Sequence, residues 1–460
     1  MRNTLVIVGA GFSGTVLAAN LLRRPPAAPT DIVLAERGRE MGRGVAYASR
    51  EFPYLLNVPA SRLSADSRDP LQFLSFARAR LGTADGEDFL PRALYGDYLQ
   101  ELLLQAERAA PPHVRLVRLF GEVTGIVQRD GAKPLAAQLA QREPILADFV
   151  ILAFGVAPPP LPAWAAGIWH HGAFRQDPRD LPNTLSKEHS VLIVGNGLTM
   201  ADAASLLSRD AGRAPTLHTI SRRGLLPRSQ TAFRAGATPQ GGEALLACAH
   251  SLKGLLKAGR TLAREMENSG GDWREAVTFM RKMAPRLWRQ LPAAEQRRFV
   301  RHLQAHWDVH RHRLPPQMSE RIEHLRRSGR LQVNAGRLQN VVAADGRLRV
   351  SWRPRGSSEL KQLLVDLVVN ATGPNFGIDD STDTLVSSLR TSGLVSADAL
   401  RLGIRTARFG ACRNAQGVAS KHMFYLGPML RADHWEATAA LELRDHAEQL
   451  AAHLLGRLGS

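Results

Sequence analysis

Residues 4–36 read TLVIVGAGFSGTVLAANLLRRPPAAPTDIVLAE, which is an apolar run, a glycine-rich turn, a helical pattern and a second apolar run. The turn has the pattern GxGxxG, formed by Gly9, Gly11 and Gly14. The first glycine permits a tight turn, the second lets a pyrophosphate approach the backbone, and the third lets helix and strand pack closely. The second run ends in Glu36, whose carboxylate can accept hydrogen bonds from both hydroxyls of an adenosine ribose. The segment therefore predicts a βαβ unit that binds a dinucleotide at the start of its helix.

A second glycine-rich turn follows another short apolar run and reads GNGLTM from Gly195 to Met200. The next strand-like run ends in Ser221-Arg222-Arg223, without an acid. Guanidinium groups at this position suit a ribose 2′-phosphate. We therefore interpret the first site as one for FAD or NAD and the second as one for NADPH. Met200 stands where a third small residue would allow the closest helix packing.

The chain has 460 residues, which is too many for one hydrophobic core and fits two or three domains. Its formal charge is +18, and only seven of its 60 basic residues are lysine. No block of lysine and arginine with interleaved aromatic residues is present, so we interpret the arginines as solvated surface residues and expect no nucleic-acid partner. An anionic substrate or cofactor phosphates are reasonable partners for this charge.

The two cysteines, Cys248 and Cys412, stand far apart, so the sequence contains neither a disulfide framework nor a CxxC redox pair. Flavin enzymes with two dinucleotide sites often pass electrons to a dithiol; here we expect oxygen or a small molecule to receive them. Met1 leads almost directly into the first strand, and no apolar stretch approaches the length of a membrane span. We therefore expect a cytoplasmic protein with no membrane partner.

A stiff boundary at Pro158-Pro159-Pro160 marks where a second domain can begin. The first unit is expected to contain a strand over 4–8, a helix from Ser13 to about Arg23 and a strand over 32–36. The remaining expected elements are strands near 114–128, 145–153 and 365–372, an arginine-rich helical stretch from about 244 to 327, and a final amphipathic helix from about Trp435 to Leu455.

The two turns and several short motifs, in this order, resemble the bacterial FAD/NAD(P)-binding oxidoreductase family that is related to flavin-dependent N-hydroxylating monooxygenases and includes urate hydroxylase-type proteins. The further motifs are Glu36-Arg37, Gly44-Val45-Ala46-Tyr47, Leu55-Leu56-Asn57-Val58-Pro59-Ala60, Arg92-Ala93-Leu94-Tyr95-Gly96, Leu198-Thr199 with Asp202, Ser221-Arg222-Arg223-Gly224, Ala371-Thr372-Gly373-Pro374 and Leu426-Gly427-Pro428. The resemblance covers nearly the whole chain, and its motifs are more specific for FAD than for one reaction.

The resemblance implies an α/β fold with two Rossmann-like dinucleotide-binding domains, in which the NAD(P)H domain is inserted into the FAD domain and carries an extra helical insert. The expected segments are residues 1–158 for the first part of the FAD-binding domain, 159–335 for the NAD(P)H-binding domain with its helical insert at 244–327, and 336–460 for the second part of the FAD-binding domain.

The two turns and the resemblance together assign the cofactor contacts. For FAD the expected contacts are Gly9, Gly11, Ser13, Gly14, Glu36, Arg37, Asn57, Thr372, Gly373 and Gly427. For NADPH they are Gly195, Gly197, Leu198, Thr199, Ser221, Arg222 and Arg223. Two residues are also candidates for catalytic contact with the flavin ring or the substrate, namely Asn57 and Trp435. The alternatives are that Asn57 caps its own loop and that Trp435 is packed in the core.

One departure from the family pattern bears on the reaction. Hydroxylating relatives often show His-Ser-x-x-Tyr before the NADPH turn, whereas here His171 and Phe174 stand where the Ser and the Tyr are expected. Because the amine-oxidising pattern is incomplete, our first specific hypothesis for the substrate is a urate-like heterocycle, and amine N-hydroxylation is the second.

The sequence therefore predicts an FAD-dependent NAD(P)H monooxygenase that uses oxygen to hydroxylate a small, nitrogen-rich or anionic substrate. Two other classes stay open. One is an NADPH-dependent flavin reductase or oxidase without oxygen transfer. The other is a flavin-binding redox sensor or interaction protein, for which the basic helical insert would be the interaction surface.

Three histidines, His302, His306 and His310, are spaced four residues apart and so predict one helical face. A zinc site is conceivable, but no acidic residue shares that face and no HExxH pattern accompanies it, so we assign no metal. A solvated helix face is one alternative. The other is contact with substrate or NADPH by Trp307, His310, Arg311 and Arg313.

Overall fold

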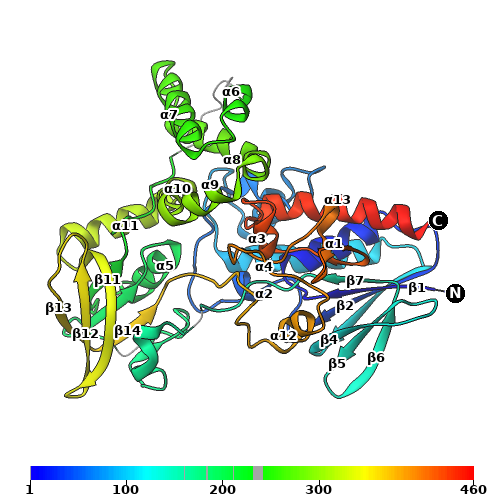
Figure 1. The fold of residues 1–460 in the computed structure, drawn as a ribbon, viewed down its shortest axis with the longest axis horizontal. Coiled ribbons are helices and arrows are strands. Elements are labelled where there is room, and N and C mark those ends of the chain that lie inside the picture. Colours follow the sequence, from blue (N-terminus) through cyan, green and yellow to red (C-terminus); the bar gives the residue numbers. More distant parts are fainter. Residues whose placement is uncertain (1, 160, 183–184, 211, 232–241, 460) are drawn as a thin grey trace. The chain divides into compact units, whose positions relative to one another are not determined.

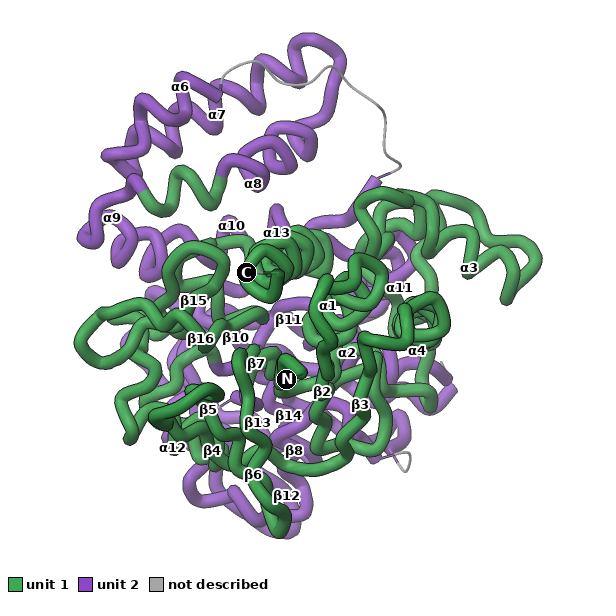
Figure 2. The backbone as a smooth tube through the Cα atoms, turned by 90° about the vertical axis from the view of Figure 1, so that its right-hand side faces the viewer, with its two compact units in different colours: residues 1–156, 284–289, 376–460 green, residues 157–283, 290–375 purple. Residues whose placement is uncertain are grey.

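The computed structural model describes residues 2–159, 161–182, 185–210, 212–231 and 242–459. The chain forms two compact units, which Figure 2 shows in different colours. Unit 1 consists of residues 1–156, 284–289 and 376–460, and unit 2 of residues 157–283 and 290–375. Unit 1 is therefore built from both ends of the chain and a short internal segment, and all of unit 2 lies between these ends in the sequence.

Unit 1 contains two sheets and the helices that cover them (Figure 1). Its elements are β1 (Asn3–Val8), α1 (Phe12–Arg23), β2 (Thr30–Glu36), α2 (Gly44–Tyr47), η1 (Ala60–Arg62), α3 (Gln72–Leu81), α4 (Arg92–Arg108), β3 (Val114–Phe120), β4 (Val123–Gln128), β5 (Leu135–Leu139), β6 (Arg142–Ala147), β7 (Phe149–Leu152), α12 (Thr384–Thr391), η4 (Arg408–Gly410), β15 (Ala411–Arg413), β16 (Ala419–Tyr425), η5 (Pro428–Ala432) and α13 (Ala440–Leu458).

The larger sheet of unit 1 has the strand order β15-β16-β7-β1-β2-β3, and all its neighbours are parallel except β15 and β16. Strand β1 is a continuous apolar run because a strand inside a parallel sheet is covered on both faces. Helix α1 packs against α4 and α13. Val8 pairs with Ala35 on one side and Leu152 on the other, so Gly9 leaves the sheet at its carboxyl edge. The smaller sheet is antiparallel, with the order β4-β5-β6.

Unit 2 contains one large sheet and a group of helices. Its elements, which include all but residues 284–289 of α8, are η2 (Ala163–Ile168), β8 (Phe174–Arg175), β9 (Ser190–Val194), α5 (Leu198–Leu207), β10 (Thr216–Ser221), α6 (Gly242–Ala247), α7 (Leu252–Asn268), α8 (Trp273–Gln290), α9 (Ala293–Arg298), the π-helix η3 (Phe299–Leu303), α10 (Gln304–Arg311), α11 (Pro316–Arg327), β11 (Leu331–Ala344), β12 (Arg347–Pro354), β13 (Lys361–Val365) and β14 (Leu367–Asn370).

The sheet of unit 2 has the order β13-β12-β11-β10-β9-β14-β8. The strands from β11 to β8 in this order are parallel, and β12 and β13 extend the sheet as antiparallel strands. Val194 pairs with Ile220 and with Asn370, so Gly195 leaves this sheet at its carboxyl edge, as Gly9 does in unit 1. The predicted α/β class with two Rossmann-like sheets is confirmed.

Two boundaries differ from the sequence-based expectation. Residues 336–375 belong to unit 2 and their strands pair within its sheet, whereas we expected them in the second part of the FAD-binding domain. An apolar run such as Leu367–Asn370 suits the interior of any parallel sheet, so its pattern does not indicate which strands it pairs with. The last helix begins at Ala440 rather than at Trp435, because the 3₁₀ helix η5 and a further turn precede it. Among the described helices, none is both long and apolar enough to cross a bilayer.

Candidate functional site

The turn after β1 requires its first and third glycines. Gly9 has φ +104°, and its N–H donates to the Ala35 carbonyl at 2.8 Å. A Cβ on Gly9 would lie 2.9 Å from the Ala153 carbonyl oxygen, and one on Gly14 would lie 1.9 Å from the Gly9 carbonyl oxygen. The backbone of β1, of α1 and of the segment after β7 is therefore in direct contact at the carboxyl edge of the sheet.

The start of α1 presents unpaired backbone N–H groups. Gly11 is the N-cap residue, and within the described chain no side chain caps the helix. The loop at Gly42–Gly44 closes one side of this turn, because the Gly42 N–H donates to the Ala10 carbonyl at 2.7 Å and Gly44 approaches Gly11 closely. Ser13 is buried in the first turn of α1. The free N–H groups and the positive end of the helix dipole suit a pyrophosphate.

Glu36 is held in place by the protein backbone. One carboxylate oxygen accepts from the Ala10 N–H at 2.8 Å, and the other accepts from the Gly38 N–H at 2.8 Å. A carboxylate oxygen has two lone pairs, so each can still accept a ribose hydroxyl. Arg37 is exposed and donates to Asp383 at 2.9 Å. Glu36 is thus oriented for a ribose, while Arg37 in this structure links two segments of unit 1.

A buried arginine next to the first turn was missed by the sequence analysis. Arg43 is 1% exposed and donates to the carbonyls of Ala93 at 3.1 Å and Tyr47 at 3.3 Å. It also forms an ion pair with Asp97 and donates to Gln100 at 3.2 Å. These bonds anchor the Gly42–Gly44 loop to α4. The arginine between two glycines was visible in the sequence, but its burial was not.

Two further residues assigned to the first site, Asn57 and Gly427, lie in two other parts of unit 1. Asn57 is half-buried in a loop that Arg92 holds, since the Arg92 Nε donates to the Leu55 carbonyl at 3.0 Å. Gly427 lies two residues after the end of β16, and a Cβ on it would come within 2.6 Å of the Tyr425 hydroxyl. That hydroxyl donates to the Phe154 carbonyl at 3.0 Å, and burial raises the pKa of Tyr425. Gly427 is therefore next to the segment that contacts Gly9.

Trp435 is 4% exposed and lies between two other side chains of unit 1. Its ring centroid is 4.6 Å from that of Trp288, and the Arg431 guanidinium lies 4.0 Å from it. The indole N–H of Trp288 donates to the Ala432 carbonyl at 3.0 Å. This environment favours the alternative in which Trp435 is packed rather than catalytic.

The turn after β9 has the same backbone as the first turn. Gly195 has φ +117°, its N–H donates to the Ile220 carbonyl at 2.9 Å, and a Cβ on it would lie 2.3 Å from the Ala371 carbonyl oxygen. Gly197 is the N-cap of α5, and nothing described lies within 4 Å of a Cβ built on it. Leu198 and Thr199 form the first turn of the helix, and Met200 is fully buried beneath it.

Asn196, between the two glycines of this turn, has an unusual environment. It is 6% exposed, and neither the Oδ1 nor the Nδ2 of its amide has a hydrogen-bond partner among the described residues. A buried amide without partners is costly, so both atoms are suited to contact with a ligand at the turn. Together with the free N–H groups of α5, this amide shows that the second turn also fits a dinucleotide.

Thr372 and Gly373, which the sequence analysis assigned to FAD, follow β14 in the sheet of unit 2. The Thr372 N–H and hydroxyl both bond to Asn370 Oδ1, at 3.2 and 2.7 Å. Since Asn370 pairs with Val194, these residues lie beside Gly195 within unit 2. The strand that was expected to complete the flavin sheet therefore borders the second turn.

The two arginines after β10 differ in their contacts with the rest of unit 2. Ser221 Oγ accepts from the Gly224 N–H at 3.0 Å, Arg222 is exposed, and Arg223 donates to the His302 carbonyl at 2.9 Å. His306 faces this group: burial, and then the positive charges of Arg223, His310 and Arg355, lower its pKa. The end of β10 is therefore a cationic region, as a 2′-phosphate site requires.

The three histidines do not lie on one regular helical face. His302 lies in the π-helix η3, while His306 and His310 lie in α10. A π-turn contains more residues than an α-turn and so shifts the register between His302 and His306. His310 Nδ1 bonds to the His306 carbonyl at 2.7 Å. Within the described ranges, no three His, Cys, Asp or Glu side chains are grouped so that they could hold a metal ion.

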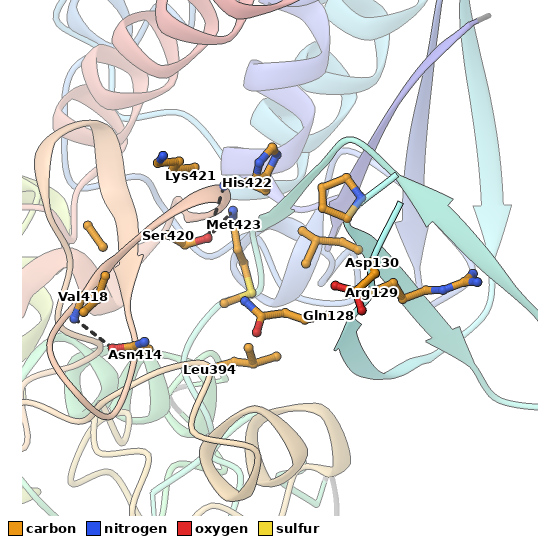
Figure 3. A pocket seen from close by; sticks show the side chains of 13 residues that line it. Gln128, Arg129, Asp130, Leu394, Asn414, Val418, Ser420, Lys421, His422 and Met423 are labelled. Carbon is orange, nitrogen blue, oxygen red and sulfur yellow. Dashed lines mark hydrogen bonds between the residues drawn. The ribbon is translucent and has the colours of Figure 1, made fainter. Parts of the chain in front are cut away.

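A cavity of about 470 Å³ lies in unit 1 between the β4–β5 hairpin and the start of β16 (Figure 3). His422 Nδ1 at its wall bonds to the Asp148 carbonyl at 2.9 Å, just before β7 begins. The cavity therefore lies at the amino ends of β7 and β16, whereas Gly9 lies at the carboxyl edge of the same sheet. Ligands of open parallel sheets bind at the carboxyl ends of the strands, so this cavity is distinct from the first dinucleotide site.

Comparison with known proteins bears on the fold and on the cofactors. Residues 6–157 match the family described as FAD-NAD(P)-binding. Among curated protein sequences, none matches the chain. The match covers the second half of β1, the first turn and β7, which together surround the Gly9 site.

Several solved structures are similar in fold over nearly the whole chain. L-lysine 6-monooxygenase from Pseudomonas syringae has a TM-score of 0.66 and 16% identity, with 100% of both chains covered. The FAD-bound cadaverine monooxygenase from Erwinia amylovora has a TM-score of 0.65 and 14% identity, covering 98% of this chain and 94% of that one. Ornithine N-hydroxylase from Kutzneria sp. 744, solved with reduced FAD, NADP+ and L-ornithine, has a TM-score of 0.63 and 16% identity, with 100% of both chains covered.

These likenesses confirm the predicted fold, and the matched family and the solved enzymes support binding of FAD and NADP(H). They also bear on the two substrate hypotheses. The solved enzymes named above act on amines, and a urate-like substrate finds no support among them.

Proposed function

We propose that this chain is an FAD-dependent monooxygenase that takes hydride from NADPH and hydroxylates the nitrogen of a small amine. One observation carries the proposal: two glycine turns with similar backbones lie at the carboxyl edges of two parallel sheets. The strand that follows the first turn ends at an acid, whereas the strand that follows the second leads into two arginines. An acid suits an unmodified ribose, and guanidinium groups suit a 2′-phosphate.

In this proposal the residues of unit 1 hold FAD. The N–H groups at the start of α1 bind the pyrophosphate, Gly9 and Gly14 allow the backbone to approach it, and Glu36 accepts from the ribose hydroxyls. Gly427 leaves room beside Phe154 for the flavin, and Asn57 offers an amide to the ring or to the substrate. Arg43 holds the Gly42–Gly44 loop in place against the turn.

The residues of unit 2 bind NADPH. Gly195, Gly197 and the first turn of α5 bind the pyrophosphate, while Arg222 and Arg223 bind the 2′-phosphate. When bound, the two cofactors supply hydride transfer and the activation of oxygen. The protein must then exclude water and bring the amine nitrogen to the flavin.

A dithiol is a poor candidate for the electron acceptor in this chain. Only two cysteines are present, and Cys412 is completely buried in the core of unit 1. Burial raises the pKa of the Cys412 thiol, which disfavours the reactive thiolate. Oxygen and a small substrate are therefore the acceptors that the proposal assigns.

The purified, FAD-loaded protein tests the proposal directly. NADPH oxidation and oxygen consumption are followed with L-lysine, L-ornithine or cadaverine, and hydroxylamine product and hydrogen peroxide are both quantified. We expect one of these amines, or a close analogue, to raise hydroxylamine at the expense of peroxide. If all the oxygen consumed appears as peroxide with every amine, the chain is an oxidase or reductase and the hydroxylation proposal is wrong. If NADPH does not reduce the flavin, a sensor function is favoured.

A further inference from the structure

The link between α10 and α11 carries an arginine in a fixed backbone position. The Leu314 N–H donates to the Arg228 carbonyl at 2.8 Å, and the Gln230 N–H donates to the Leu314 carbonyl at 2.8 Å. Leu314 itself is buried in the core of unit 2. Arg313, the preceding residue, is therefore held beside the segment 228–230.

The first turn of α8 is attached to the same segment. Arg274 Nε donates to the Ser229 carbonyl at 3.1 Å, and its Nη1 donates to the Asp272 carboxylate at 2.8 and 3.1 Å. The Trp273 ring lies edge-on to His310 of α10, with centroids 5.2 Å apart. Helices α8 and α10 and the segment 228–230 thus meet around the α10–α11 link.

Positive charge accumulates at this meeting point. Burial, and then the cations Arg274, Arg281 and Arg311, lower the pKa of Arg313 to about 10. Among the described residues, Asp272 is the one carboxylate that raises the pKa of Arg313, and it already accepts hydrogen bonds from Arg274. Among the charges that act on Arg313, three are cations and one is a carboxylate, so an added anion would offset the repulsion that Arg313 experiences.

Arg313 also has unused hydrogen-bond donors. Its Nε and Nη1 are shielded from solvent, and neither finds an acceptor in the part of the chain that the structure describes. A buried charged donor without an acceptor is strongly unfavourable, and guanidinium groups bind carboxylates and phosphates through charge-assisted bonds. One anion would satisfy the donors and offset the repulsion among the four cations.

We propose that Arg313, with Arg274, Arg281 and Arg311, forms a binding site for a carboxylate or phosphate group of the substrate. The assignment to the substrate rests on the proposed function. The cationic region after β10 is assigned to the cofactor 2′-phosphate, and neither Arg222 nor Arg223 is among the described charges that act on Arg313. The substrate of this chain is accordingly an amine that also carries an anionic group, as L-lysine and L-ornithine do and cadaverine does not.

The binding step can be tested without turnover. The melting temperature of the FAD-loaded protein is measured with saturating NADP+, so that both cofactor sites are filled, while inorganic phosphate replaces chloride at constant ionic strength. We expect saturable stabilisation by phosphate in the wild type. Arg313→Gln should raise the half-saturating phosphate concentration at least about tenfold, as expected for the loss of a charge-assisted bond. The matched control is Arg326→Gln, an exposed arginine on α11 paired with Glu323, which should behave as the wild type.

The outcomes separate this proposal from the proposed function. Equal phosphate stabilisation in the wild type, Arg313→Gln and Arg281→Gln would overturn the anion site, whatever the enzyme does with NADPH. If Arg313→Gln does not fold, Arg281→Gln decides in its place. With active enzyme, Arg313→Gln should raise the KM for L-lysine at least about tenfold and leave that for cadaverine within about twofold. An equal change in both KM values contradicts recognition of the carboxylate.

Discussion

The turn at Gly9 and the turn at Gly195 follow strands of the same kind, and each first glycine has a positive φ near the same value, +104° and +117°. At Gly9 the surroundings are closed: the third glycine, Gly14, is in backbone contact, and Glu36 is bonded to two backbone N–H groups. At Gly195 they are open, because the Asn196 amide has no partner among the described residues and Arg222 is exposed. The same turn is thus built into two different kinds of site.

This difference teaches how one backbone motif can serve two purposes. A site whose polar groups are fixed by the protein before the ligand arrives loses little freedom on binding and holds its ligand tightly. A site that leaves donors and acceptors to be satisfied by the ligand gains less from preorganisation. We therefore expect the first turn to retain its cofactor through many turnovers and the second to release its cofactor in each one.

The largest expected effect is at the third glycine of the first turn. Gly14→Ala places a Cβ where the Gly9 carbonyl lies, so the helix and strand must separate. We expect a loss of about 3 kcal/mol or more in the free energy of unfolding, together with loss of FAD. The measurements are urea denaturation and the ratio of flavin to protein absorbance.

The control for this prediction is Gly197→Ala in the second turn, where a Cβ meets nothing described within 4 Å. We expect a change in stability of less than about 1 kcal/mol and a weaker affinity for NADPH. If Gly14→Ala has the same free energy of unfolding and the same flavin content as Gly197→Ala, the contrast between a closed and an open turn is wrong.

The second prediction concerns Arg43, which anchors the Gly42–Gly44 loop beside the first turn to α4. Arg43→Met removes the guanidinium that donates to Asp97 and to the carbonyls of Tyr47 and Ala93. These three acceptors then lose the hydrogen bond from Arg43. We expect a loss of about 3 kcal/mol in the free energy of unfolding, measured in urea, and faster release of FAD. Arg118→Met, which breaks a more exposed pair with Glu107, should cost less than about 1 kcal/mol. Equal costs would mean that Arg43 does not brace the turn.

The smallest effect is expected at the open site. Arg222→Gln removes one charge from the cationic region and should raise the KM for NADPH about 10- to 100-fold, the equivalent of one charge-assisted hydrogen bond. The KM for NADH should change by less than about twofold, because NADH has no 2′-phosphate. Arg349→Gln, at an exposed position on β12, is the control and should alter neither. Parallel changes for both nucleotides would refute the 2′-phosphate assignment.

Local patterns in the sequence were sufficient for the elements that form each turn. The helix after Gly11 and the strands on either side of it were expected nearly where α1, β1 and β2 lie, because glycine spacing and apolar runs are local signals. The partner of β14 was not predictable in this way, since an apolar strand fits either sheet and pairing is decided by distant residues. The burial of Arg43 and the π-turn at Phe299–Leu303 also depend on packing that no local pattern records.

The division of unit 1 between both ends of the chain has a consequence for folding during synthesis. Strand β7 pairs with β16, and Val150 of β7 is opposite Met423 of β16. This edge of β7 therefore stays unpaired until residue 423 has been synthesised. Pairing between such distant segments is slow, and domains generally fold as their residues emerge. Unit 2, whose residues end at 375, can therefore be finished while the first sheet still exposes an open edge at β7. A nascent chain should consequently acquire its nucleotide-binding unit around Gly195 before the unit around Gly9, in the reverse of their order in the sequence.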